Sequence, residues 1–265
     1  MYDFNYHQPQ SVADAAKTIA GNDEAKLLAG GMTLIPTLKQ RLAHPSDLVD
    51  LAKIPELKGI RREGNAIVIG AMTRHVEVAT SDVVKGAIPG LAHLAEGIGD
   101  PQVRNRGTIG GSIANNDPAA DYPSAVLALG ATVITNKRKI AADDFFKGMF
   151  ETALAPDEII TAVSFPIPEK AGYSKFPNPA SRYAIVGVFV AKTGGGVRVA
   201  VTGAAPCVFR QKDMESALAK SFTSDAVAAI KQSASGLNSD IHASAEYRAH
   251  LVTVMAKRAV AAALG

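Results

Sequence analysis

The chain has 265 residues, of which 47% are hydrophobic and 20% are charged, and its formal net charge is +3. This composition is that of an ordinary globular protein, at a length where one hydrophobic core begins to divide into domains. No run of five like charges occurs, the nearest being residues 137–139, and aromatic residues make up only 6%. The sequence therefore indicates neither a nucleic-acid patch nor a stacking platform for single strands.

The single cysteine, Cys207, excludes an internal disulfide and a cysteine-ligated iron–sulfur cluster, which needs about four thiolates. Its neighbours are apolar, which favours a small buried hydrophobic residue over a reactive thiol. The histidines show no metal-like spacing. The chain shows no signal-peptide pattern and no apolar run near the ~18 residues of a membrane span, so we expect a soluble cytoplasmic protein without a membrane span.

The first 60 residues have the pattern of small βα units. Ser11 is predicted to cap a helix that ends near Ala20, because apolar side chains then recur on one helical face. Residues 26–29 and 47–51 are predicted to be short strands, and residues 37–42 are predicted to be helical.

A glycine pair, a hydroxyl side chain and a helix start follow the strand predicted at residues 26–29. This combination is typical of a phosphate site built from backbone amides and a helix N-terminus. The segment lacks the Lys-Ser/Thr ending of a P-loop and the Gly-x-Gly-x-x-Gly spacing of a dinucleotide-binding turn. Its residues, here called the first glycine loop, are Ala29, Gly30, Gly31, Met32, Thr33 and Leu34.

Residues 61–165 have the pattern of a second unit that mixes strands and helices. Turn residues separate its β-branched runs from its helical runs. The predicted strands are residues 65–71, 131–135 and 158–165, the predicted helices are 73–78, 91–98 and 124–129, and a loop is predicted at 100–107.

A second segment with a glycine pair, residues 108–123, is too polar and too rich in turn residues for a core strand. Adjacent glycines let a ligand approach the backbone without a Cβ in the way, and successive amides curled into a nest bind anionic oxygens. The residues of interest are Thr108, Gly110, Gly111 and Ser112, with Asp117 and Asp121 downstream as acceptors for ligand hydroxyls. One glycine pair alone would more simply be a connecting loop, but two favour a nucleotide whose pyrophosphate lies between them.

Residues 170–265 differ in character. Two strands, 183–191 and 196–203, are joined by three glycines in a hairpin pattern, and helices are predicted at 212–220, 224–235 and from 243 to the end. An antiparallel sheet followed by helices predicts a separate α+β domain. We place the boundary in the proline-containing segment from Pro166 to Pro179, giving domains 1–168 (with subdomains of about 1–60 and 61–168) and 169–265.

The two glycine motifs together resemble the medium, FAD-binding subunit of the molybdenum hydroxylases, the carbon monoxide dehydrogenase and xanthine dehydrogenase family. The motifs are Ala-Gly-Gly-x-Thr-Leu-Ile-Pro and Thr-Ile-Gly-Gly-Ser-Ile-Ala-Asn-x-Asp-Pro-Ala-Ala-Asp-x-Pro. Their order and separation match the family over nearly the whole chain. The resemblance implies an α+β fold: a two-part FAD-binding domain of the vanillyl-alcohol-oxidase (PCMH) type, then a small α+β C-terminal domain of antiparallel sheet plus helices.

The resemblance also implies roles for single residues. Both glycine segments would bind FAD non-covalently, and Asp121 would accept a hydrogen bond from a hydroxyl of FAD, although it is equally placed to cap the following helix. Ile98 and Ile160 would line the cofactor. Lys175 would contact it and Tyr183 would lie against the flavin ring, whereas without the resemblance these two are a surface lysine and a strand residue.

Two positions depart from common patterns of the family. Met32 stands where several members carry His or Gln, and Ser112 stands where Asp or Asn is frequent. FAD binding should persist, because the backbone does most of it, but no subtype is assigned.

The function implied by the resemblance is electron transfer within a multi-subunit enzyme. Molybdopterin would lie on a large partner subunit and [2Fe–2S] clusters on a small one, in a dimer of heterotrimers, and FAD would pass electrons to a quinone, NAD or oxygen. The segment from Asp100 to Arg106, with Arg104 and Arg106, is the candidate for part of the electron route or interface, because it leads directly into the second glycine segment. The alternatives are a self-sufficient FAD oxidoreductase of the vanillyl-alcohol-oxidase-like group, for which the ~95 residues after Pro166 are few, and a non-enzymatic nucleotide-binding module.

Overall fold

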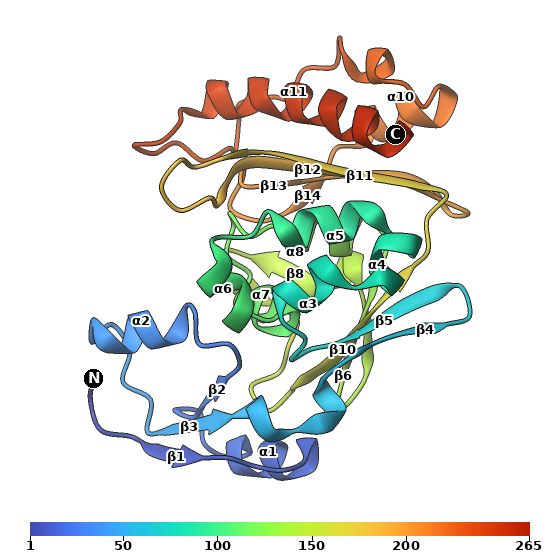
Figure 1. The fold of residues 1–265 in the computed structure, drawn as a ribbon. Helices are drawn as coiled ribbons and strands as arrows, with labels where there is room; N and C mark the ends of the chain where they lie inside the picture. The colour runs from blue at the N-terminus through green and yellow to red at the C-terminus, as the bar shows by residue number, and fades with distance from the viewer.

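The computed structural model describes residues 1–265, which form three parts in chain order (Figure 1). The N-terminal part is a parallel three-stranded sheet with strand order β1-β3-β2, and helix α1 packs against its central strand β3. Ser11 caps its first helix by accepting a hydrogen bond from the Asp14 amide, which confirms the predicted start. Its elements are β1 (Asn5–His7), α1 (Val12–Ile19), β2 (Lys26–Leu28), α2 (Leu34–Lys39), β3 (Asp47–Asp50) and two 3₁₀ turns (Leu51–Lys53 and Pro55–Leu57).

The central part is an antiparallel five-stranded sheet of order β4-β5-β10-β6-β7, covered by helices. Strand β10, which follows the helices in the sequence, lies between β5 and β6 and pairs with both. Its strands are β4 (Ile60–Glu63), β5 (Ala66–Gly70), β6 (Thr132–Thr135), β7 (Lys139–Ala141) and β10 (Ile160–Pro166), with the small hairpin β8 (Phe146–Gly148) and β9 (Glu151–Thr152). Its helices are α3 (His75–Thr80), α4 (Asp82–Ala87), α5 (Pro89–Glu96), α6 (Pro101–Arg106), α7 (Ile109–Asn115), α8 (Tyr122–Ala128) and α9 (Ala142–Phe145).

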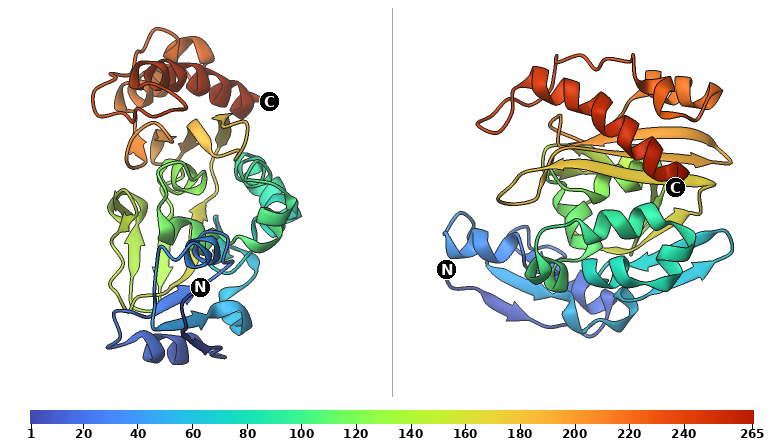
Figure 2. Two further views of the ribbon diagram at one scale, coloured as in Figure 1. Left: turned by 90° about the vertical axis from the view of Figure 1, so that its left-hand side faces the viewer. Right: turned by 45° about the horizontal axis from the view of Figure 1, so that its top comes forward.

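The C-terminal part is an antiparallel sheet of order β11-β12-β13-β14 that lies between two helical layers (Figure 2). Helix α11 packs on β11 and β12 from one side, and α5 and α8 pack on the sheet from the other. Its elements are β11 (Lys170–Pro177), β12 (Ala184–Thr193), β13 (Gly196–Thr202), β14 (Phe209–Arg210), α10 (Lys212–Lys220), a 3₁₀ turn (Ser224–Val227) and α11 (Ala245–Leu264).

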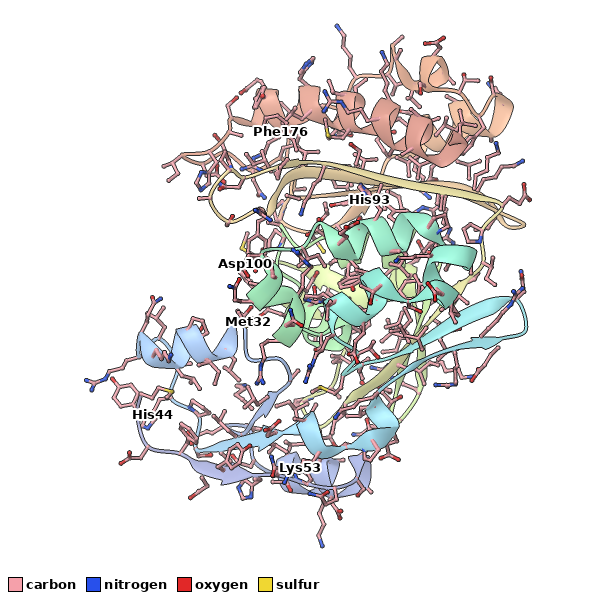
Figure 3. All side chains as sticks on the ribbon, in the orientation of Figure 1. Met32, His44, Lys53, His93, Asp100 and Phe176 are labelled. Atoms are coloured by element: carbon pink, nitrogen blue, oxygen red, sulfur yellow. The ribbon has the colours of Figure 1, made fainter.

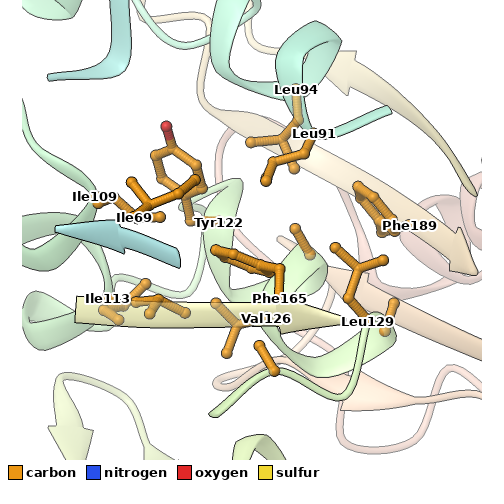
Figure 4. Packing of buried hydrophobic residues seen from close by; sticks show 14 of the residues in the cluster. Ile69, Leu91, Leu94, Ile109, Ile113, Tyr122, Val126, Leu129, Phe165 and Phe189 are labelled. Carbon is orange, nitrogen blue, oxygen red and sulfur yellow. The ribbon is translucent and has the colours of Figure 1, made fainter. Parts of the chain in front are cut away.

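The core of the central part continues into the C-terminal sheet. Tyr122 and Phe165 pack with Phe189 of β12 in one cluster (Figure 4), while Val188 and Val190 of the same strand pack on α11 in a second cluster. A strand buried on both faces reads as a continuous apolar run, as residues 184–191 do. The C-terminal sheet is therefore held directly against the helices that surround the central part.

Most predicted elements are confirmed, and the differences have local causes. Residues 101–106 are helix α6 instead of a loop: Asp100 accepts a hydrogen bond from the Val103 amide and Pro101 occupies the first helical position. This cap-and-proline pair is a helix-start signal in the sequence. The helix predicted at 224–235 is only the 3₁₀ turn Ser224–Val227, and strand β11 lies inside the segment predicted as the boundary.

The length and hydropathy of the helices test whether any of them could cross a membrane. No helix combines the length and the hydropathy that crossing a bilayer requires.

Candidate functional site

Residues from all three parts of the chain meet at one cavity of 590 Å³, a size typical of small-molecule sites. Figure 3 labels Met32, a lining residue from the N-terminal part, close to Asp100 at the start of α6 in the central part. All the predicted cofactor residues except Lys175 line the cavity: Ala29, Gly30, Gly31, Met32, Thr33, Leu34, Ile98, Thr108, Gly110, Gly111, Ser112, Asp121, Ile160 and Tyr183. The fold thus gathers residues that are up to about 150 positions apart in the sequence.

The first glycine loop presents unused hydrogen-bond donors to this cavity. The amides of Gly30, Gly31, Met32 and Thr33 donate no hydrogen bond within the protein. Gly31 has φ +76°, a left-handed conformation that turns the chain between β2 and α2. Gly30 and Gly31 are half-buried, and Met32 and Thr33 are exposed. Consecutive N–H groups without a protein partner at a cavity suit a ligand with anionic oxygens, such as a pyrophosphate.

The second glycine segment does not supply amide donors in this way. It begins helix α7, and the Ile109 and Gly110 amides donate to the carbonyls of Thr73 and Ala71 at 3.1 and 2.8 Å. The Gly111 and Ser112 amides donate to Thr108, its Oγ1 and its carbonyl oxygen respectively. The expectation of a second amide nest is therefore wrong for these four residues, because the helix start consumes their donors. The hydroxyl of Ser112 has no hydrogen-bond partner in the protein and remains available to a ligand.

Two of the glycines are required by contacts of the chain with itself. A Cβ on Gly30 would collide with the Arg106 carbonyl oxygen, and a Cβ on Gly110 would lie against the backbone of Ala71. Gly30 and Gly110 were expected mainly to leave room for a ligand, and this expectation is corrected. Their missing side chains let the first glycine loop, the α6–α7 junction and the backbone at Ala71 approach one another closely. The N-terminal part is seated on the α6–α7 junction by this contact.

Asp121 is a buried carboxylate at the cavity wall. Its Oδ1 accepts hydrogen bonds from the Tyr173 hydroxyl at 2.5 Å and from Lys175 Nζ at 2.9 Å, and its Oδ2 accepts none from another residue. Burial raises the pKa of Asp121, against the positive charge of Lys175, which lowers it. The side chain makes no capping bond to helix α8, so the structure does not support the helix-cap alternative.

Lys175 stands behind Asp121 instead of lining the cavity. Its Nζ also donates to the carbonyl oxygens of Gly97 and Arg182, both at 2.8 Å. Its side chain is only 10% exposed, so it is not the surface lysine that its sequence context suggests. A direct contact between Lys175 and a cofactor stays a prediction.

The remaining predicted residues form apolar and aromatic walls. Ile160 lies at the start of β10 and is buried, whereas Tyr183, just before β12, is 43% exposed at the rim. Partial burial raises the pKa of the Tyr183 phenol, and Asp117 and Asp121 raise it further. The phenol is therefore neutral at physiological pH and presents an uncharged ring.

His75 is a lining residue that the sequence analysis missed. Its Nδ1 is buried without a hydrogen-bond partner, and its ring lies 5.4 Å from that of Tyr122. Burial, with a smaller effect of the nearby Arg104 charge, lowers the pKa of His75 to about 4. A single histidine at a helix start carries no sequence signal.

The cavity has further polar lining residues that the sequence analysis did not single out. They are Lys26, Thr37, Asn115, Glu158, Ser181 and Arg182.

The depressed pKa of His75 predicts acid sensitivity. Between the unfolded pKa of ~6.5 and the folded pKa of about 4, the unfolded chain binds a proton that the folded chain excludes, so stability is lost as pH falls through this window. We expect this residue to remove about 2 kcal/mol of unfolding free energy between pH 7 and pH 5. Denaturant titrations of His75→Phe, which keeps a ring beside Tyr122, should show a loss smaller by that amount. Equal losses of unfolding free energy in the wild type and in His75→Phe would contradict the lowered pKa of His75.

Comparisons with known proteins cover almost the whole chain. Residues 2–168 match the family described as "FAD binding domain in molybdopterin dehydrogenase", and residues 171–263 match "CO dehydrogenase flavoprotein C-terminal domain". The carbon monoxide dehydrogenase medium chain of Hydrogenophaga pseudoflava is 38% identical over 98% of this chain and 96% of its own length. The glyceraldehyde dehydrogenase medium chain of Sulfolobus acidocaldarius is 36% identical over 97% of both chains.

Solved structures also resemble this chain over nearly its whole length. A chain of carbon monoxide dehydrogenase from Hydrogenophaga pseudoflava superposes with a TM-score of 0.90 at 37% identity, over 99% of this chain and 98% of that one. A chain of quinoline 2-oxidoreductase from Pseudomonas putida 86 gives a TM-score of 0.88 at 29% identity, over 99% and 97% of the two chains. The two matched domains and the relatives that are similar over nearly the whole chain show the family. This chain belongs to the FAD-binding medium subunits of the molybdenum hydroxylases.

Proposed function

We propose that this chain carries electrons from iron–sulfur clusters of a partner subunit through FAD to an external acceptor. The observation that carries the proposal is the cavity itself: four consecutive unpaired amides of the first glycine loop share it with the Asp121 carboxylate and a rim tyrosine. Anionic oxygens, sugar-like hydroxyls and a flat ring are the groups such a surface binds together.

The roles of the residues follow from their chemistry. The amides of residues 30–33 hold the pyrophosphate, Oδ2 of Asp121 accepts a hydrogen bond from a hydroxyl of FAD, and Ile98, Ile160 and Tyr183 enclose the ring system. Bound FAD supplies the electron storage, and the chain's own residues bind, orient and partly shield it. The single cysteine is consistent with iron–sulfur clusters that lie on another subunit.

The partners are proposed from the relatives. Those proteins are named as medium chains or as subunits of dehydrogenase complexes. We propose a small iron–sulfur subunit and a large molybdopterin subunit, assembled as a cytoplasmic dimer of heterotrimers, with this chain divided into domains 1–168 and 169–265. Arg106 is exposed at the end of α6 and remains the interface candidate, whereas the guanidinium of Arg104 is engaged by the carbonyls of Ile98 and Gly99.

The proposed function predicts that substrates reduce the flavin only in the complete complex. We expect the isolated chain to release its flavin as FAD on acid denaturation, and to be reduced by dithionite but not by carbon monoxide, aldehydes or purines. Co-expression with a small iron–sulfur subunit and a large molybdopterin subunit should give a complex whose flavin is bleached by its substrate. Absorbance near the flavin maximum measures this bleaching.

The controls separate the alternatives. Rapid bleaching of the isolated chain by a simple alcohol or aldehyde would overturn the subunit function in favour of a self-sufficient oxidoreductase. Absence of bound flavin in the chain and in the complex would favour a nucleotide-binding module without redox activity.

A further inference from the structure

The turn formed by Gly97, Ile98 and Gly99 is held by cationic side chains from three other segments. Lys175 Nζ donates to the Gly97 carbonyl at 2.8 Å. Arg104 Nη1 donates to the carbonyls of Ile98 and Gly99 at 3.0 and 2.9 Å, and Arg182 Nη1 donates to that of Gly99 at 3.3 Å. Every carbonyl of this turn is therefore bound by a charged donor, and charge-assisted hydrogen bonds are the stronger ones.

Two of the three donors, Lys175 and Arg104, stand outside the cavity, whereas two residues of the turn, Ile98 and Gly99, line it. The third donor, Arg182, lines the cavity itself. Arg104 forms no ion pair with any carboxylate, so its guanidinium is committed to the turn. Through these contacts Lys175 and Arg104 set the position of residues that line the cavity.

Lys175 also joins this turn to the segment that carries Tyr183. Its Nζ donates to the Arg182 carbonyl at 2.8 Å, one residue before Tyr183. Arg182 has a backbone φ of +62°, a conformation that residues other than glycine rarely adopt. Its amide donates to the Asn178 carbonyl. A strained residue persists only where its surroundings enforce it, and Lys175 is one of the groups that do so.

We propose that Lys175 and Arg104 are positioning residues that clamp residues 97–99 and 178–183, so that Ile98 and Tyr183 are already in place when FAD binds. The inference rests on the proposed site for FAD, and it assigns Lys175 a positioning role through the carbonyls of Gly97 and Arg182. Pre-organised walls raise affinity because fewer side chains lose freedom on binding.

The test compares Lys175→Met and Arg104→Met in the full chain without flavin. Hydrogen–deuterium exchange should quicken in peptides covering 97–99 for both variants, and in those covering 178–183 for Lys175→Met. Fluorescence titration should show FAD binding weakened on the order of tenfold in each, the equivalent of ordering one or two side chains. In the double variant the loss should be smaller than the product of the single losses, because both side chains hold one turn.

Lys192→Met is the matched control, because Lys192 lies in the same sheet and pairs with Glu169 at the surface. It should change neither exchange nor affinity. Arg104→Met leaves no buried carboxylate without its partner, so it keeps the test decisive even if Lys175→Met folds poorly. The exchange measurements need no flavin, so a failure of the FAD site itself would be recognised separately.

Two outcomes would overturn the inference. Weaker FAD binding by Lys175→Met with unchanged exchange in both segments would assign the lysine to direct cofactor contact. Wild-type exchange and wild-type affinity in Arg104→Met would show that the turn needs no clamp.

Discussion

Gly110→Val is expected to destabilise the central part by more than about 3 kcal/mol and to abolish FAD binding with it. A Cβ at Gly110 would lie against the Cα, Cβ and carbonyl oxygen of Ala71, which is itself buried. The Gly110 amide donates to that same carbonyl, so helix α7 has no room to withdraw without losing the bond. Denaturant unfolding of the chain and flavin titration measure the two effects.

Two other glycines calibrate this expectation. Gly86 lies in helix α4 with no atom within 4 Å of an added Cβ, so Gly86→Ala should raise stability by about 0.5–1 kcal/mol. A Cβ on Gly111 meets Thr108 Oγ1 at 3.0 Å and the Ala29 Cβ at 3.3 Å, so Gly111→Ala should be intermediate. A wild-type unfolding midpoint for Gly110→Val would refute the close packing of α7 on Ala71.

Asp121→Ala is expected to cost about 3 kcal/mol of folding free energy and to weaken FAD binding. The substitution leaves the Lys175 ammonium buried without a counter-charge and removes the acceptor of the Tyr173 hydroxyl. The matched control is Asp157→Ala, because Asp157 pairs with Lys137 at side chains that are 41% and 43% exposed. Exposed pairs contribute at most about 1 kcal/mol, so this control should unfold nearly as the wild type does.

The double variant Asp121→Ala/Lys175→Met identifies the cause of that loss. Removing both charges should cost less than the sum of the two single changes, because neither charge is then left alone in the interior. Additive losses would mean that Asp121 and Lys175 stabilise the fold independently, contrary to their 2.9 Å contact.

Features that depend on short segments can be predicted from the sequence. The Ser11 cap, the glycine turn between β2 and α2, the two strands joined by residues 194–196 and the last helix all follow from local propensities, and the structure has each of them. The start of helix α6 is also encoded by two neighbouring residues, the capping Asp100 and Pro101, although residues 100–107 are predicted above as a loop. The motifs of the two glycine segments were specific enough to indicate the family.

The chemical environment of each cavity residue depends on contacts between distant segments. Whether an amide is free for a ligand depends on what packs beside it: the amides of residues 30–33 have no partner, whereas those of residues 109–112 are used by Thr73, Ala71 and Thr108. Lys175 and Asp121 form a buried pair although 54 positions separate them in the chain, and no local pattern encodes such a contact. Hydrogen-bond satisfaction and burial belong to the assembled chain, because each depends on atoms contributed by distant segments.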